Sequence, residues 1–428
     1  MKIQVFQSDE GDCLLLTGAD GKRILCDGGM ANAFRQFVAP NIAKIPKKEK
    51  IDIVYLSHID SDHISGILEM MNNAVEWKVH EYQVNNIDAN HKPPKVPRPP
   101  AVGGIWHNAF HELTQDNTGE IEDMLAASAL VLSGSSLPDL RATAAMNQNL
   151  ATSVKEAINL TRRVGDGQLG IPVNKPAGGK LMLVRETRKA ITLGGFKLYI
   201  IGPFTEDLEK LRKDWNKWLD ANKKALKSIR TQSERTEREL GMNEVDELLG
   251  PLFAQAKKFG DRTAVTPPNL ASLMFYLEEK KTGRTILLTG DGHADDVIKG
   301  LGHNKKLDKN GKLHVDVLKV QHHGSEYNMT KPFAESVTAD HYIWCGNGGD
   351  ENPDLETLEV VVDARLADGT KRAFKFWFNS HSSVAAGKKG SPAHMKLVEK
   401  LVQKSVTRSK GRLKVQYLKS DSFTLTLA

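Results

Sequence analysis

The chain has 428 residues, 40% of them hydrophobic and 26% charged, and carries a formal net charge of +6. These values are ordinary for a globular protein, and the small positive excess is compatible with a polyanionic partner without indicating one. The cysteines form no CxxC pair and no run approaches ~18 apolar residues, which argues against a disulfide framework, a cysteine-rich zinc site, a signal peptide and a membrane span. We therefore expect a cytoplasmic protein.

The first 60 residues are predicted to form short strands joined by tight turns. Strand-prone runs at 2–7, 13–17 and 23–27 are separated by SDEGD and GADGK, which have turn composition. Residues 31–42 are typical of a helix. The run IDIVYLS (51–57) is almost continuously apolar, which predicts a strand buried on both faces.

The segment HISGILEMM begins the next predicted helix, and Asp62 is expected to cap it by accepting amide hydrogens of the first turn. His58, Asp60, Asp62 and His63 therefore lie where a strand passes through a short loop into a helix. His58 and Asp60 are two residues apart in an extended loop and point the same way. Asp62 and His63 project from the helix start toward the same point. Two carboxylates this close repel each other unless cations neutralise them, so the spacing predicts a site for two metal ions.

The middle of the chain is less regular. HKPPKVPRPP (91–100) is predicted to be a surface loop, and helices are expected within 121–132 and 151–163. A buried strand follows at 196–203. Residues 205–229 predict an amphipathic helix that packs its apolar side on the domain, with polyanion binding by its lysines as the alternative.

Strands and helices alternate in the last part of the chain. Strands are predicted at 270–279, 284–290, 315–321, 341–345, 374–378 and 412–418, with helices after GDGHADD, around 354–363 and at 395–404. This alternation indicates an α/β architecture. The lysine-rich tail is interpreted as a solvated surface, with phosphate-backbone binding as the alternative.

The segment from His58 to His63 resembles the HxHxDH signature of the metallo-β-lactamase fold, with Asp60 in place of the second histidine. Further motifs resemble its ComEC-like branch, the competence proteins of DNA uptake, in the same order along the chain. They are GDCLLL with ILCDGG, NLASLMFYL with Asn269, LLTGD ending at Asp291, and LKVQHHGS. The resemblance covers roughly the first 80 residues and 265 to 365.

The resemblance implies a set of site residues. The implied metal ligands are His58, Asp60, Asp62, His63, Asp291 and His322, with Asp291 bridging two ions and His322 favoured over His323. Asp27, Asn269, His293, His323 and Ser325 are expected to support the site or contact substrate. We expect Asp27 to fix a neighbouring loop, and we interpret His293 first as a surface helix cap.

The implied fold is a four-layer αββα sandwich over 1–428, with a largely helical insertion at about 85–190, another at 205–262, and a C-terminal α/β extension at about 366–428. The implied activity is hydrolysis by a hydroxide shared between two divalent ions, Zn²⁺ or Mn²⁺, with Asp62 as its base. Asn269 and Asp60 replace histidines of the wider fold, which shifts the expectation toward manganese.

The resemblance favours a phosphodiesterase or nuclease with a nucleic acid or nucleotide as substrate and without membrane attachment. It also suggests a protein partner from a bacterial defence-type operon. Two alternatives stay open. One is a hydrolase of small thioesters or lactones. The other is a non-catalytic domain that binds metal together with a partner protein or nucleic acid.

Overall fold

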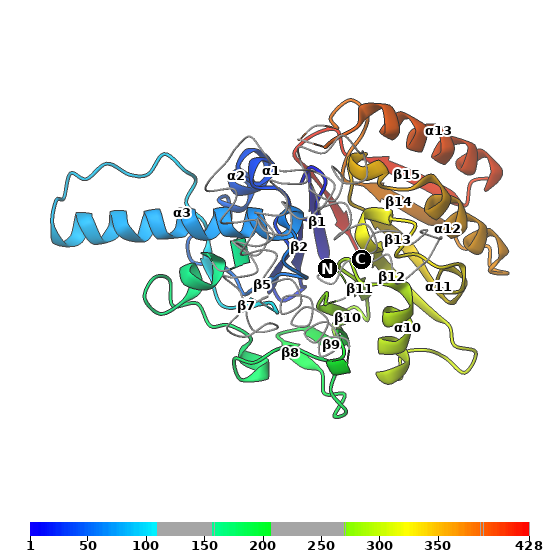
Figure 1. Ribbon diagram of the computed structural model, residues 1–428, viewed down its shortest axis with the longest axis horizontal. Helices are drawn as coiled ribbons and strands as arrows, with labels where there is room; N and C mark the ends of the chain where they lie inside the picture. The colour runs from blue at the N-terminus through cyan, green and yellow to red at the C-terminus, as the bar shows by residue number, and fades with distance from the viewer. Residues whose placement is uncertain are drawn as a thin grey trace, which may run out of the picture.

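The computed structural model describes residues 1–108, 156–157, 159–206, 269, 271–385, 387 and 389–427. The described chain is a mixed α/β protein with two large sheets, an arrangement compatible with a sandwich (Figure 1). The helix predicted at 121–132 lies outside the described residues, as do the predicted 205–229 helix from residue 207 on and residues 151–155.

The first sheet has six strands in the order β16–β1–β2–β3–β5–β7. The strands β1, β2 and β3 are antiparallel, β3, β5 and β7 are parallel, and the C-terminal β16 pairs antiparallel with β1. All three residues of β5 are buried, as its apolar run predicts. The bounds are β1 (Lys2–Phe6), β2 (Leu14–Thr17), β3 (Arg23–Cys26), β5 (Ile53–Tyr55), β7 (Ile105–Trp106) and β16 (Ser422–Thr426).

The second sheet has eight strands in the order β15–β14–β13–β12–β11–β10–β9–β8. The strands β11 to β15 are parallel, so the loops after β11 and β12 leave the same edge of the sheet. The bounds are β8 (Ile191–Leu193), β9 (Phe196–Gly202), β10 (Met274–Glu279), β11 (Thr285–Leu288), β12 (Leu313–Lys319), β13 (Val337–Trp344), β14 (Phe374–Phe378) and β15 (Leu413–Tyr417). A separate pair joins β4 (Lys50–Ile51) to β6 (Ala101–Val102).

Three apolar clusters show how these elements pack. One cluster combines side chains of both large sheets, such as Val5, Tyr55, Phe275 and Val317. A second joins the six-stranded sheet to helices α1 (Ala31–Ala33), η1 (Phe34–Val38), α2 (Ala39–Ile42) and α3 (Ser61–Asn86). The third joins the eight-stranded sheet to α10 (Ala294–His303), α11 (Lys331–Ser336), α12 (Leu355–Ala367) and α13 (Pro392–Arg408). The helices thus lie on two flanks of the paired sheets (Figure 1).

Short helical turns complete the described chain: η3 (Lys175–Ala177), η5 (Gln321–Gly324) and η6 (Gly349–Glu351). The predicted helix 31–42 is found as the consecutive segments α1, η1 and α2. Every helix among the described residues is too short or too polar to cross a membrane.

The prediction that Asp62 caps α3 was wrong. The helix begins at Ser61, so Asp60 occupies the N-cap position and Asp62 lies in the first turn. The side chain of Asp60 makes no capping hydrogen bond. Both carboxylates are therefore left available for other partners.

Candidate metal centre

The candidate metal centre lies where loops from both sheets meet. His58 and Asp60 come from the loop after β5, and His63 lies in the first turn of α3. Asp291 follows β11, and the pair His322–His323 lies in η5 directly after β12. Because β5, β11 and β12 end at this place, three strand ends fix the positions of the side chains.

Asp291 stands at the centre of this group. Its carboxylate lies 3.4 Å from Nε2 of His63, 3.5 Å from that of His323, and 3.6 Å from those of His58 and His322. The same nitrogen of four imidazoles therefore points at one carboxylate, which is 1% exposed as a residue. Such convergence is the geometry of ligands around metal ions rather than of an ordinary ion pair.

The rings of His58 and His63 are held from behind through their Nδ1 atoms. Nδ1 of His63 lies 3.1 Å from Oδ2 of Asp27, and Nδ1 of His58 lies 3.0 Å from the hydroxyl of Ser57. That hydroxyl donates to Asp27 at 2.9 Å, so it is free to accept from His58. The Ser57 amide also donates to Asp27 at 2.7 Å. Asp27 thus fixes the loop that carries His58 and orients both rings.

The rings of His322 and His323 are held in the same way. Nδ1 of His322 lies 2.7 Å from Oδ1 of Asn328, and Nδ1 of His323 lies 3.2 Å from Oδ1 of Asp12. In a neutral ring, a nitrogen that faces an oxygen acceptor carries the proton, which leaves Nε2 with its lone pair. Metal-binding histidines are oriented by such contacts on their second nitrogen.

The inward atoms also contact carboxylates and one another. Nε2 of His58 lies 3.6 Å from Oδ2 of Asp60. Nε2 of His323 lies 2.9 Å from Oδ2 of Asp62 and 3.4 Å from Nε2 of His63. Ligands of a tetrahedral ion at about 2.1 Å are about 3.4 Å apart, close to most of these separations.

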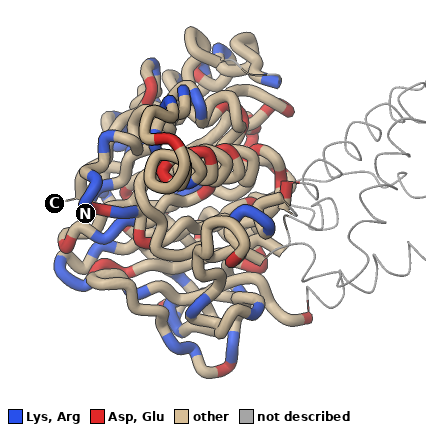
Figure 2. Tube along the Cα trace, turned by 90° about the vertical axis from the view of Figure 1, so that its left-hand side faces the viewer, with Lys and Arg blue, Asp and Glu red and all other residues tan. Residues whose placement is uncertain are grey.

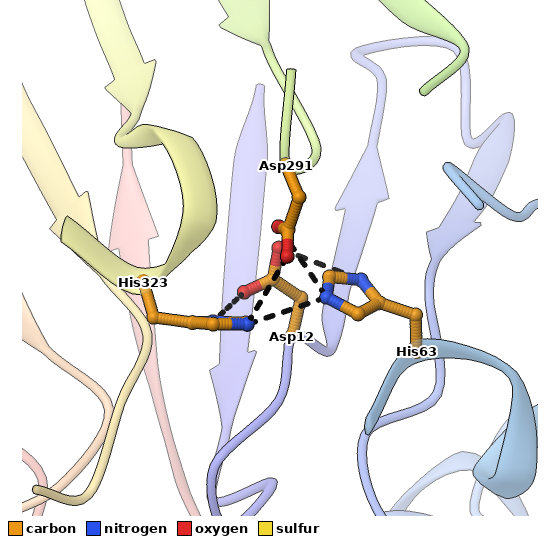
Figure 3. A group of neighbouring side chains, drawn as sticks. All are labelled: Asp12, His63, Asp291 and His323. Atoms are coloured by element: carbon orange, nitrogen blue, oxygen red, sulfur yellow. Dashed lines mark hydrogen bonds and ion pairs between the residues drawn. The ribbon is translucent and has the colours of Figure 1, made fainter. Parts of the chain in front are cut away.

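Figure 3 shows how Asp12, His63, Asp291 and His323 point toward one another. One ligand atom of each lies within 4.8 Å of the others, and all four residues are buried. Asp12 differs from the rest because its second oxygen contacts the ammonium group of Lys319. We therefore assign Asp12 to the support of His323 rather than to the inner ligands.

The backbone at His322 and His323 explains how two consecutive side chains reach one site. Their φ angles are +42° and +56°, in the left-handed region that residues with a side chain rarely adopt. Such a conformation costs on the order of 1–3 kcal/mol per residue and is found mostly at functional sites. It turns His323 toward Asp62 and His63, and His322 toward Asp291 and Asn269.

The charges in the centre stabilise one another. Burial opposes ionisation of Asp291, but the four surrounding imidazoles lower its pKa well below the usual value. Burial also opposes protonation of His63 and His323, yet Asp291 and neighbouring carboxylates raise the pKa of both rings well above 6.5. The carboxylates around these two rings thus favour their protonated form.

Unsatisfied buried atoms test whether metal ions fit the centre. Nε2 of His58, Oδ1 of Asp291 and Oδ1 of Asn269 are among the buried atoms of the site without a hydrogen-bond partner in the described residues. A buried polar atom without a partner costs about 1–3 kcal/mol, so several of them in one site need an explanation. All three are atoms of metal-ligand type, and the first two belong to the contacts that converge on Asp291. The residues present therefore fit divalent cations.

The remaining predicted residues lie around the centre in different roles. The amide nitrogen of Asn269 lies 3.4 Å from Nε2 of His322. His293 caps α10 by accepting from the Asp295 amide at 3.2 Å, but it is buried and not on the surface as expected. Ser325 is buried, and its hydroxyl accepts from the Tyr327 amide at 3.4 Å.

Two charged residues of the centre were missed from the sequence. In the sequence, Asp12 was noted only as part of the GDCLLL motif, and Lys319 was assigned only to a predicted buried strand. Lys319 is 2% exposed, and Asp12 and Asp291 raise its pKa above the usual value although burial opposes this. Burial likewise opposes ionisation of Asp12, but Lys319 and His63 lower its pKa to about 2. A lysine inside the apolar run VDVLKVQ was the signal for this pair.

Comparison with known proteins gives no family. No family model matches the chain, and no curated protein matches it. A solved structure, the crystal structure of unliganded PDE1 from yeast, has 10% sequence identity and a TM-score of 0.40, with 100% of this chain and 99% of that chain covered. A likeness at this score supports no inference, so the functional assignment depends on the site itself.

Proposed function

We propose that the protein is a metal-dependent hydrolase of the metallo-β-lactamase fold that cleaves phosphodiesters. The observation that carries the proposal is the convergence of four histidine Nε2 atoms on Asp291. The three apolar clusters support the four-layer αββα arrangement, with one cluster between the sheets and one under each helical flank. We extend this domain over 1–428, with insertions at about 85–190 and 205–262 and an extension at about 366–428 that supplies β14, β15 and β16.

Two divalent ions would be held by the side chains around Asp291. His58, Asp60 and His322 would hold one of them, with the Asn269 carbonyl oxygen facing the same place. Asp62, His63 and His323 would hold the other. Four imidazoles suit Zn²⁺, whereas the carboxylates and the amide oxygen also suit Mn²⁺, so we propose one or both of these metals.

The charge of the site supports two ions rather than one. Asp12 is paired with Lys319. The remaining carboxylates that contact the histidines carry together the charge that two divalent cations would neutralise. They are Asp27, Asp60, Asp62 and Asp291. When the ions bind, His63 and His323 would have to give up any ring proton on the coordinating nitrogen.

The open side of the centre includes Asp60, Asp62 and His322. Their side chains are 30%, 23% and 27% exposed, against 2% for Asp291. Divalent ions bound here would supply an activated water and neutralise charge on an attacked phosphorus centre. Asp62 is held ionised because His63 and His323 lower its pKa, although burial opposes this. It is thus placed to orient a water and accept its proton.

A phosphodiester is the substrate class that the remaining features favour. The ComEC-like motifs favour a nucleic acid or nucleotide, and the net charge of +6 is compatible with one. Acidic and basic residues are interspersed along the described trace in Figure 2, so attraction of phosphates would come from the metal centre more than from one basic face. We propose single-stranded DNA or RNA as the first substrates to test.

The test compares the wild type with Asp62→Ala on bis-p-nitrophenyl phosphate and on single-stranded DNA and RNA, with Mn²⁺ or Zn²⁺. Loss of the base is expected to lower turnover by about 10²–10⁴-fold. Asp363→Ala is the control, because Asp363 is an exposed carboxylate that pairs with Arg408. If the wild type holds two ions and cleaves a thioester or lactone but no phosphodiester, the substrate class is wrong.

A further inference from the structure

Lys319 is a buried cation beside a site that would bind cations. Its ammonium group contacts Oδ2 of Asp12, lies 3.7 Å from Oδ1 of Asp291 and donates to the Gly290 carbonyl at 3.1 Å. Its side chain is 2% exposed. A positive charge at this distance repels metal ions. Its presence therefore needs a compensating role.

The neighbours of Lys319 indicate that role. The ammonium group holds one oxygen of Asp12, and the other oxygen lies 3.2 Å from Nδ1 of His323. Without Lys319, Asp12 would be an unpaired carboxylate in the interior, free to turn toward His63, whose Nδ1 lies 3.9 Å away. The ring of His323 would then lose its fixed orientation. The bond to the Gly290 carbonyl also holds the residue that precedes Asp291.

We propose that Lys319 is a positioning residue that, through Asp12 and Gly290, fixes His323 and Asp291 as ligands of the ion on the Asp62 side. This inference rests on the proposed two-ion site. It predicts whether metal affinity rises or falls when Lys319 is removed. If Lys319 acted through its charge alone, its removal would strengthen metal binding. If it acts through position, its removal weakens binding, and loss of such outer contacts typically costs about 10–100-fold in affinity.

The test measures Zn²⁺ and Mn²⁺ binding by titration calorimetry and chelator competition, with elemental analysis of the loaded protein. Lys319→Met is expected to weaken one of two binding steps by at least about tenfold and to leave the other nearly unchanged. Lys319→Arg keeps the charge and should retain most of the affinity. Lys306→Met is the control, because Lys306 is a lysine with only 14% of its side chain exposed that pairs with Glu278 at 2.7 Å.

A second variant distinguishes a folding defect from a specific loss of metal affinity. Breaking a buried ion pair on one side is strongly destabilising, whereas removing both charges is much less so. Asp12→Asn/Lys319→Met removes both, and it should fold and still show the weakened step. Equal or tighter binding of both ions in a folded variant would overturn the proposal. Two ions bound without phosphodiester cleavage would refute the proposed function, while the titrations would still decide the role of Lys319.

Discussion

Gly11 allows the loop that carries Asp12 to reach the candidate metal centre. A Cβ atom at this position would lie 1.7 Å from the carbonyl oxygen of Asp62 and 2.6 Å from its carbonyl carbon. Real Cβ contacts are almost never below 3.0 Å, so Gly11→Ala must displace the start of α3 or the loop by more than 1 Å. Overpacking of this kind costs about 1–3 kcal/mol. A misplacement of about 1 Å at a reacting centre can lower turnover 10²-fold.

The assay combines metal content with phosphodiester turnover under saturating metal. For Gly11→Ala we expect loss of the ion on the Asp62 side and a fall in turnover of about 10²-fold. Gly302→Ala in α10 is the matched control, since its Cβ would meet only Leu307 at 3.7 Å. Alanine there should leave the site intact and keep or slightly raise stability. Wild-type metal content and turnover in Gly11→Ala would refute the reasoning about this contact.

Three further outcomes follow from the same geometry. Asp27→Asn should weaken metal binding by about 10–100-fold in chelator competition, because Asp27 holds His63 and Ser57, and an unchanged affinity would contradict that role. Carboxylates raise the pKa of His63 and His323, so both rings must lose protons when they bind metal. Metal affinity should therefore rise with pH, and calorimetry in buffers of different ionisation enthalpy should detect proton release near pH 7. Zero proton release would count against these two ligands. His293→Ala should lower unfolding free energy by about 0.5–2 kcal/mol in urea, with metal content unchanged.

Local patterns in the sequence predicted much of the architecture. The run predicted as one strand over 51–57 forms β5 at Ile53–Tyr55, while Ile51 belongs to β4 in a separate pair of strands. The predicted strands and helices after residue 270 are found with differences in their ends. The spacing of His58, Asp60, Asp62 and His63 indicated side chains that the structure brings to one place. These features depend on neighbours in the chain, which is why they could be inferred from periodicity and position.

Long-range contacts could not be inferred in this way. The pair of Asp12 and Lys319 joins a loop before β2 to the end of β12, more than 300 positions later. The orientation of His322 and His323 depends on two consecutive left-handed backbone conformations that their sequence does not favour. A sequence-based choice between the two histidines was therefore premature, because the structure directs both toward Asp291.

The central claim is that Asp291 lies between two divalent ions. A crystal structure of the protein loaded with Mn²⁺ or Zn²⁺, with anomalous scattering recorded at the metal edge, tests it most directly. We predict two anomalous peaks on opposite sides of the Asp291 carboxylate, one beside His58 and one beside His63. A fully loaded protein with no peak at Asp291, or with peaks only elsewhere, would contradict the account.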